Sequence, residues 1–321
     1  MLLGGEPYVA VMRGSVVESV HNVAGYAVDA RGVPVFSFGT VDVPIFLRSA
    51  AKPFIAAAAV ATGVAERFGL EPREIAVMAA SHSGEPFHLE TVRSILKKIG
   101  LDESALRCGP ETGFTEPITN NCSGKHAGIL ALCVATGADP DTYLDPGNPA
   151  QQRILSFCAR ASDEPLESLT IAVDGCGVPV YATTLRHAAL SYRRLATLDE
   201  LDPAGARALQ VVRDAMIANP EYMSGTGEFD AAMIRAFDGT LVCKGGAEGV
   251  LAGALLDRKI GFAIKIIDGH ERARPPATIE ALRAAGLLSE ARFEALQTFA
   301  RPVVKNKSGR VVGRIRAIGD R

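Results

Sequence analysis

The sequence lacks the features by which membrane, fibrous and nucleic-acid-binding proteins are usually recognised. It contains no uninterrupted run of about 18 apolar residues, so no membrane-spanning helix is expected. Low-complexity tracts, fixed-period repeats and long runs of charge are absent as well. The net charge is only -2, which argues against nucleic acid or an anionic membrane as a partner. The N-terminus lacks the basic start and apolar core of a signal peptide, so we expect a cytoplasmic protein.

Cysteine is too rare for a disulfide scaffold, with 6 residues in a chain of 321. Cys122 and Cys176 are flanked by glycine and polar residues, where a packing cysteine has little to contact. These two thiols are therefore candidates for a chemical role. The other cysteines lie among apolar residues, where packing accounts for them: Cys108, Cys133, Cys158 and Cys243.

Composition and length predict one large catalytic unit that spans residues 1–321. Apolar residues make up 48% and charged residues 22%, as in ordinary soluble globular proteins. Turn residues and alternating patterns predict strands near both ends and helices in the middle. The expected strands include 8–12, 16–20, 26–29 and 41–47, with hairpins in 241–267 and 303–317; the expected helices include 56–61, 150–161, 178–195, 204–218 and 278–285.

This order of elements predicts an α/β fold with one mixed, mainly antiparallel sheet. Residues 1–48 and 238–321 are expected to form the sheet lobe, because strand patterns occur at both ends of the chain. Residues 49–237 are expected to form a mostly helical lobe inserted between the two parts of the sheet.

A Ser-x-x-Lys pair, Ser49 and Lys52, separates a strand-like run from an alanine-rich helical segment. Pro53 fits the first turn of that helix, where proline is tolerated. Residues at i and i+3 share one face of a helix or 3₁₀ turn, so both side chains point the same way. A neutral lysine can take the proton of a serine hydroxyl and so make it a nucleophile. The alternative is a helix-start serine beside a solvated lysine.

Two polar loops lie further along the chain. Residues 81–85 read Ser-His-Ser-Gly-Glu between two apolar segments. In the second loop, Cys122, Lys125 and His126 share one side of the first turn if a helix begins near residue 123. Simple helix capping needs only one polar residue, whereas each of these loops offers several.

A strand and a glycine-rich turn complete the set of polar segments. The strand at 170–173 runs into Asp174-Gly175-Cys176-Gly177, where the glycines allow a sharp turn with Asp174 and Cys176 at its tip. Much later, Lys244 starts a Lys-Gly-Gly strand. Ser-x-x-Lys, a polar loop and then this strand follow the order of the serine β-lactamase signature, in which the last element is Lys-Thr-Gly.

Five blocks together make the chain resemble, along nearly its whole length, the asparaginase II family, the rhizobial-type (class 3) L-asparaginases. The resemblance implies a fold similar to serine β-lactamases and glutaminases. It further implies hydrolysis of the substrate L-asparagine to L-aspartate and ammonia by a homodimer. The blocks are residues 48–53, 81–86, 121–128, 174–179 and 244–249.

The same resemblance assigns roles to individual residues. His126 is expected to position the substrate, and zinc is expected to do the same, because serine nucleophiles are available. A zinc-bound lysine is rare, since it must be deprotonated. The resemblance implies these catalytic pairs and zinc ligands: Ser49 with Lys52, Ser81 with Lys244, and Cys122, Cys176 and Lys125 around zinc.

Asparagine carries a carboxylate and an ammonium group, so its site needs a cation and an anion. We expect Arg48 near the carboxylate and Asp174 near the ammonium group. A surface charge at a strand end is the alternative for Arg48. Which serine is the nucleophile stays open on the sequence, with Ser49 preferred.

Two other functions fit the same residues. One is a β-lactamase or penicillin-binding type of serine acyl hydrolase, which shares the Ser-x-x-Lys plan. The other is a non-catalytic zinc- or amino-acid-binding protein, in which Lys52 and Lys244 are merely surface cations. Turnover of nitrocefin, or binding of asparagine without ammonia release, distinguishes them from an asparaginase.

Overall fold

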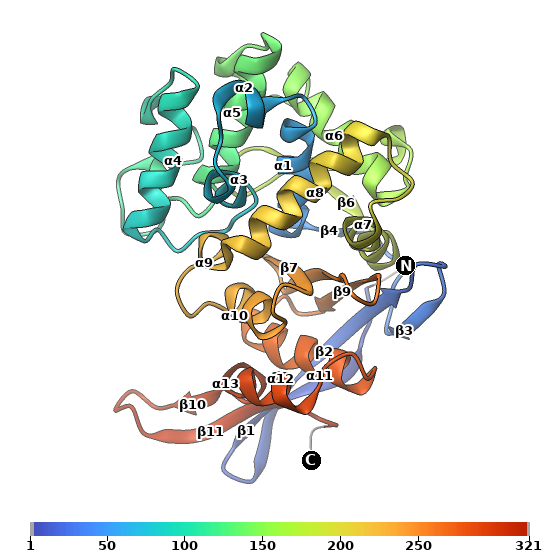
Figure 1. Ribbon diagram of the computed structural model, residues 1–321. Coiled ribbons are helices and arrows are strands. Elements are labelled where there is room, and N and C mark those ends of the chain that lie inside the picture. Colours follow the sequence, from blue (N-terminus) through green and yellow to red (C-terminus); the bar gives the residue numbers. More distant parts are fainter. Residues whose placement is uncertain (1–2, 320–321) are drawn as a thin grey trace.

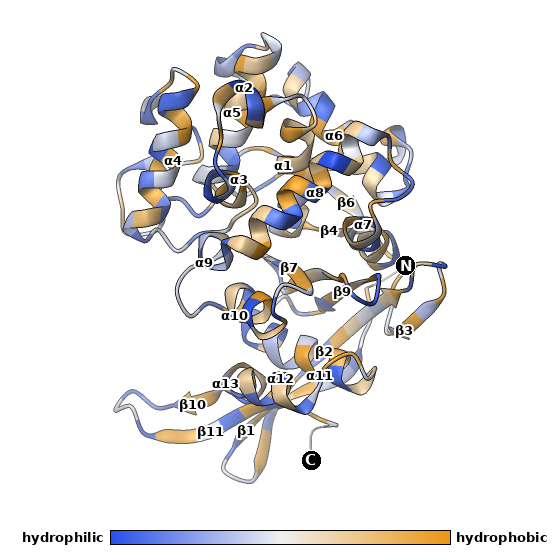
Figure 2. Ribbon diagram, in the orientation of Figure 1, coloured by the Kyte–Doolittle hydropathy of each residue, from blue (hydrophilic) through white to orange (hydrophobic). Residues whose placement is uncertain are grey.

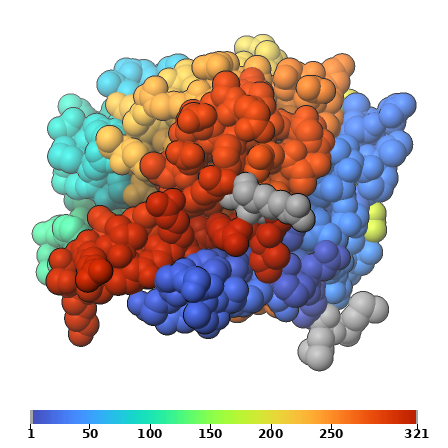
Figure 3. All heavy atoms as spheres, turned by 90° about the horizontal axis from the view of Figure 1, so that it is seen from below, coloured from blue at the N-terminus to red at the C-terminus, as the bar shows by residue number. Residues whose placement is uncertain are grey.

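The computed structural model describes residues 3–319 and has two layers of different composition. A helical lobe occupies the upper half of Figure 1, and a large sheet extends below it. Figure 3 shows N-terminal and C-terminal segments side by side on the lower face, where β1 (Glu6–Arg13) pairs antiparallel with β11 (Val311–Ala317). Both ends of the chain therefore complete one sheet. The expected α/β class, a mainly antiparallel sheet with an inserted helical lobe, is confirmed.

The large sheet has eight strands, in the order β10-β11-β1-β2-β9-β8-β7, with β3 paired to β2. All its strand pairs are antiparallel. A smaller sheet in the helical lobe has the order β4-β6-β5. The remaining strands are β2 (Val16–Val28), β3 (Pro34–Phe38), β4 (Ile45–Phe46), β5 (Thr170–Val173), β6 (Pro179–Thr183), β7 (Leu241–Gly246), β8 (Val250–Leu255), β9 (Ile260–Ile266) and β10 (Val303–Lys305).

Helices fill most of the chain between β3 and β7, and three more follow β9. The α-helices are α1 (Lys52–Val60), α2 (Val64–Phe68), α3 (Pro72–Met78), α4 (Pro86–Lys98), α5 (Ser123–Thr136), α6 (Pro149–Ser162), α7 (Leu185–Thr197), α8 (Pro203–Ala218), α9 (Pro220–Met223), α10 (Phe229–Ala236), α11 (Arg274–Ala284), α12 (Glu290–Ala295) and α13 (Gln297–Ala300). The 3₁₀ helices are η1 (Arg48–Ala51), η2 (Glu103–Ala105), η3 (Pro117–Thr119), η4 (Pro140–Thr142), η5 (Leu166–Ser168) and η6 (Glu271–Ala273).

The core lies between the middle strands and the helices that cover them. Every residue of β7, β8 and β9 is buried, because α7 packs against this part of the sheet from the helical lobe and α10 and α11 also contact it. Strands covered in this way are apolar on both faces and not alternating. Figure 2 shows the same contrast among helices: α1, inside the lobe, is largely apolar, whereas α4 at its edge carries hydrophilic residues.

Local structure departs from the sequence prediction in β2 and in β6, among other places. The two strands expected at 16–20 and 26–29 are one continuous strand, β2, which pairs with β1, β3 and β9 along its length. The helix expected over 178–195 begins only at α7, because residues 179–183 pair with β5 and β4 as strand β6. Thr184 ends the strand and caps the helix, accepting a hydrogen bond from the backbone N–H of His187.

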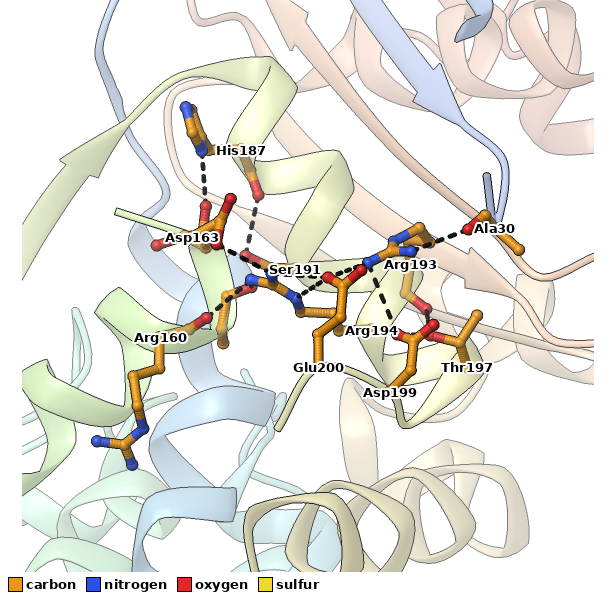
Figure 4. A network of polar contacts seen from close by, with 12 residues as sticks. Ala30, Arg160, Asp163, His187, Ser191, Arg193, Arg194, Thr197, Asp199 and Glu200 are labelled. Atoms are coloured by element: carbon orange, nitrogen blue, oxygen red, sulfur yellow. Dashed lines mark hydrogen bonds and ion pairs between the residues drawn. The ribbon is translucent and has the colours of Figure 1, made fainter. Parts of the chain in front are cut away.

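Arg194 ties the end of α6 to the loop that follows α7 (Figure 4). Its side chain is only 4% exposed and donates to the carbonyl oxygens of Arg160 and Ala161, at 2.8 and 3.0 Å. It also contacts Asp163 and Glu200, at 3.1 and 2.8 Å. The guanidinium thus adds a donor to two carbonyl groups at the C-terminus of this helix.

Replacing Arg194 by methionine should lower the free energy of unfolding by about 2 kcal/mol, because two carbonyl oxygens in a buried position lose a charged donor. Urea denaturation followed by circular dichroism measures the change. Arg153→Met is the control, since Arg153 is an exposed residue of α6. Equal stability of both variants would show that this network contributes nothing.

No helix among residues 3–319 is both long enough and apolar enough to cross a membrane.

Candidate active site

One cavity of about 590 Å³ lies where the helical lobe meets the end of β7. Its volume is in the range typical of small-molecule sites. Segments far apart in the sequence contribute to its wall: the 3₁₀ helix η1, the loop before α4, the segment before α5, the turn after β5 and the end of β7. The predicted site residues in this wall are Arg48, Ser49, Ser81, Cys122, Asp174, Cys176 and Lys244.

Ser49 lies in η1, which packs directly on the end of β7. A Cβ atom on Gly246 would lie 2.5 Å from the carbonyl oxygen of Leu47 and 3.4 Å from the backbone nitrogen of Ser49. Only glycine therefore permits this approach of strand and helix. Arg48, just before Ser49, has a φ of 53°, a strained value for a residue with a side chain. The serine is thus held by a backbone that the sheet constrains tightly.

Lys52 contacts Ser81 in the wall of the cavity. Its Nζ donates to Ser81 Oγ at 3.0 Å and to the carbonyl oxygens of Ala80 and Asn121 at 2.5 and 3.5 Å. The side chain is 0% exposed. Within the described part of the chain, Lys52 forms no ion pair with a carboxylate. Its amine is therefore buried beside three oxygen atoms, one of which belongs to a serine of the site, and beside the side chain of Cys122.

Burial lowers the pKa of Lys52 to about 8, because desolvation penalises the ammonium form. The side chain of Cys122 opposes this shift, whereas the nearby cations Lys125 and Lys244 reinforce it. A lysine with this pKa is partly neutral near physiological pH and can accept a proton from a serine hydroxyl.

Lys244 has a different partner from the one that the family resemblance implies. Its Nζ lies 3.0 Å from Asp230 Oδ2 and 2.8 Å from the carbonyl oxygen of Gly245. Asp230 also accepts from the backbone N–H of Gly245 at 2.8 Å. The hydrogen bond to Ser81 therefore comes from Lys52, and Lys244 is instead one half of a buried ion pair.

Arg48 and Asp174, expected to bind opposite charges of the substrate, also contact each other. Arg48 Nε lies 2.6 Å from Asp174 Oδ1, and Lys125 Nζ lies 3.3 Å from Asp174 Oδ2. Although burial alone would raise it, these two cations lower the pKa of Asp174 to about 2. The cavity wall thus holds a fixed carboxylate beside a partly exposed guanidinium.

Cys122, Cys176 and Lys125, the expected zinc ligands, lie together. Lys125 Nζ donates to Cys176 Sγ at 3.0 Å, and Cys122 Sγ donates to Asn121 Oδ1 at 3.1 Å. The interaction between the two thiols lowers the pKa of Cys122, with help from the nearby lysines, and raises that of Cys176. Two thiols suit zinc, but Lys125 would have to give up a proton to bind it. Although burial alone would lower it, Cys122, Cys176 and Asp174 raise the pKa of this amine.

Groups of three or more histidine, cysteine, aspartate or glutamate residues placed to hold a metal are absent from residues 3–319.

His126 lies behind the cavity wall and does not line it. It is 0% exposed, and its Nδ1 is 2.6 Å from the hydroxyl oxygen of Tyr143. Its Nε2 is buried without a hydrogen-bond partner among the described residues. His126 is therefore not placed to touch a substrate in this cavity.

The family described as L-asparaginase II matches residues 9–317. The chain belongs to the L-asparaginase II family. This asparaginase II protein is accordingly a hydrolase that acts on amides, and its substrate is a small molecule. No curated protein matches its sequence.

Several solved structures show some similarity to this chain. The native form of a protein called Mglu has 15% identity, covers 89% of this chain and 69% of its own, and gives a TM-score of 0.47. A putative β-lactamase from Bacteroides dorei has 12% identity over 81% of this chain and 93% of its own, with a TM-score of 0.43. A β-lactamase from Mycobacterium bovis has 13% identity over 82% and 94%, with a TM-score of 0.44. Identities and TM-scores this low say nothing about the activity of this chain.

The sequence analysis did not single out several cavity residues of the asparaginase II protein, among them Asp230 and Arg274. Asp230 lies in the first turn of α10, a common place for an acidic residue, so nothing in the sequence marks it. Gly245 is an indirect sign of Arg274, because serine β-lactamases have threonine at the corresponding position and glycine leaves space there for another side chain. A Cβ atom at position 245 would lie 2.7 Å from the guanidinium of Arg274, which fills that space.

Proposed function

We propose that the protein hydrolyses L-asparagine to L-aspartate and ammonia with Ser49 as nucleophile and Lys52 as base. The observation that carries this proposal is the contact between the buried amine of Lys52 and Ser81 Oγ, at 3.0 Å, in a cavity that Ser49 also lines. An amine that can be neutral, two hydroxyl groups and a fixed Arg–Asp pair are what hydrolysis of a small zwitterionic amide needs.

In the proposed first step, Ser49 Oγ attacks the side-chain carbonyl carbon of asparagine, and neutral Lys52 takes the hydroxyl proton. The C–N bond then breaks, and ammonia leaves with the proton that Ser81 relays from Lys52. Water attacks the resulting β-aspartyl ester of Ser49, releases aspartate and restores the serine. Backbone N–H groups at the start of the helix and the ammonium of Lys244 stabilise the negative charge on the carbonyl oxygen.

The head group of the substrate is assigned to the pair formed by Arg48 and Asp174. Asp174 accepts hydrogen bonds from the ammonium group, and the free nitrogens of Arg48 bind the carboxylate. Both residues line the same cavity as Ser49. His126, which is buried, would act on the substrate only through its neighbours, because it does not reach the cavity.

Zinc would be held by Cys122, Cys176 and Lys125. Its positive charge, when bound, would help to position the substrate. Zinc removal is expected to raise the KM for asparagine about tenfold with a smaller change in kcat. Metal content per chain before and after chelation shows whether zinc was present, and Cys122→Ser should reduce that content. An unchanged KM after demonstrated zinc removal would show that the metal is dispensable.

Ammonia release from asparagine and glutamine, with nitrocefin turnover measured in parallel, tests the proposed reaction. We expect ammonia from asparagine and no hydrolysis of nitrocefin. Turnover of nitrocefin alone would favour a β-lactamase, and binding of asparagine without ammonia release would favour a binding protein. A homodimer stays a prediction of the family resemblance, and a cytoplasmic location stays a prediction from the sequence.

A further inference from the structure

The two buried lysines of the cavity differ in the groups that surround them. Lys52 contacts a serine hydroxyl and backbone carbonyl oxygens. Lys244 contacts a carboxylate, Asp230, at 3.0 Å. Both lysines are almost completely inaccessible, at 0% and 1% exposure. The hydrogen-bond partners of Lys244 thus include a carboxylate, whereas those of Lys52 do not.

Asp230 is itself held firmly. Its Oδ2 accepts from Lys244 Nζ and from the backbone N–H of Gly245, at 3.0 and 2.8 Å. It lies in the first turn of α10, where the helix dipole favours a negative charge. Arg274, also in the cavity wall, adds a nearby cation. All of these neighbours favour a carboxylate in one fixed position.

We propose that Asp230 is a positioning residue that fixes the amine of Lys244 at the end of β7 through their ion pair, so that Lys244 serves as a cation beside the carbonyl group that is attacked and not as the base. This inference rests on the proposed Ser–Lys mechanism. The family resemblance paired Lys244 with Ser81, and the ion pair with Asp230 gives this lysine a different task.

A purely structural role accounts poorly for this ion pair. Burying two charges costs more than their attraction returns in many proteins, and apolar residues of similar size are often as stable. Moreover, Asp230 Oδ1 is buried without a hydrogen-bond partner among the described residues, which adds to that cost. The pair lies in the cavity wall and not in the interior of the core. A function in the reaction explains why charges are kept here.

Asp230→Asn tests the proposal, because it preserves the shape of the side chain and removes its charge. We expect kcat for asparagine to fall about 100-fold, the size typical for loss of a preorganised electrostatic contact, with KM within about threefold of the wild type. Asp230→Glu keeps the charge and should recover most of the lost kcat. Circular dichroism confirms that each variant is folded.

Glu74→Gln is the matched control for stability. Glu74, in α3, is only 1% exposed and forms an ion pair with Lys98 at 2.6 Å, but it does not line the cavity. Loss of this carboxylate should lower stability and leave kcat unchanged. If kcat fell only because a buried carboxylate was lost and stability decreased, Glu74→Gln would lower kcat as much as Asp230→Asn does. Equal losses of kcat in the two variants would overturn the proposal.

A double-mutant cycle with Lys244→Met decides whether Asp230 acts through Lys244. We expect Asp230→Asn to have no further effect on kcat when Lys244 is already methionine. An equal loss in both backgrounds, or wild-type kcat in Asp230→Asn, would contradict the proposal. These outcomes differ from failure of the proposed reaction, in which the wild-type protein itself releases no ammonia from asparagine.

Discussion

Lys52→Met is expected to lower kcat for asparagine hydrolysis about 1000-fold, within the range for loss of a general base. Lys52 is 0% exposed, and its amine is the group that contacts Ser81 at 3.0 Å. Methionine fills similar space without an amine, so the fold should persist. Steady-state ammonia release at saturating asparagine measures the loss.

Two comparisons make the Lys52 experiment specific. Lys52→Arg should be nearly as inactive, because a guanidinium does not give up its proton at accessible pH. Lys97→Met is the control, since Lys97 is an exposed residue of α4 and should retain wild-type kcat. High activity in Lys52→Arg would mean that position 52 supplies only positive charge and not a base.

Asp174→Asn is expected to raise the KM for asparagine about 100-fold, because the ammonium group loses its anionic partner. The carboxylate of Asp174 is kept ionised by Lys125 and Arg48, which lower its pKa to about 2. Succinamic acid, which is asparagine without the ammonium group, separates binding from a change in the fold. The wild type should prefer asparagine, and the variant should treat both compounds alike.

Asp141→Asn serves as the matched change at an exposed carboxylate outside the cavity. It should leave the KM for both amides unchanged. If Asp174→Asn kept the wild-type preference for asparagine over succinamic acid, another group would have to bind the ammonium.

The sequence predicted which residues line the cavity better than it predicted which of them are hydrogen-bonded to each other. Ser49 could be named from its Ser-x-x-Lys spacing, and Ser81 and Lys244 from the family resemblance. The structure places all three around one cavity. Partners across the cavity depend on side-chain positions that no local pattern records. The contact of Lys52 with Ser81 and that of Lys244 with Asp230 are of this kind.

Secondary structure was predicted wrongly where contacts with distant parts of the chain determine it. Residues 179–183 are an apolar run that suits a helix or a buried strand equally well, and pairing with β5 makes them a strand. The strand expected at 41–47 is reduced to β4, because Pro44 precedes it and cannot donate a ladder hydrogen bond. The fold class could be predicted from the sequence because it depends on strand patterns at both ends of the chain and not on the exact bounds of each element.

The acyl-enzyme is the species that tests the Ser–Lys account most directly. Wild-type protein mixed with asparagine, quenched in acid within milliseconds and digested, should yield a β-aspartyl ester on the peptide that contains Ser49. Mass spectrometry of Ser49→Ala treated in the same way should find no adduct, whereas Ser81→Ala should still be able to form one. An adduct that persists in Ser49→Ala, located on Ser81, would contradict the assignment of the nucleophile.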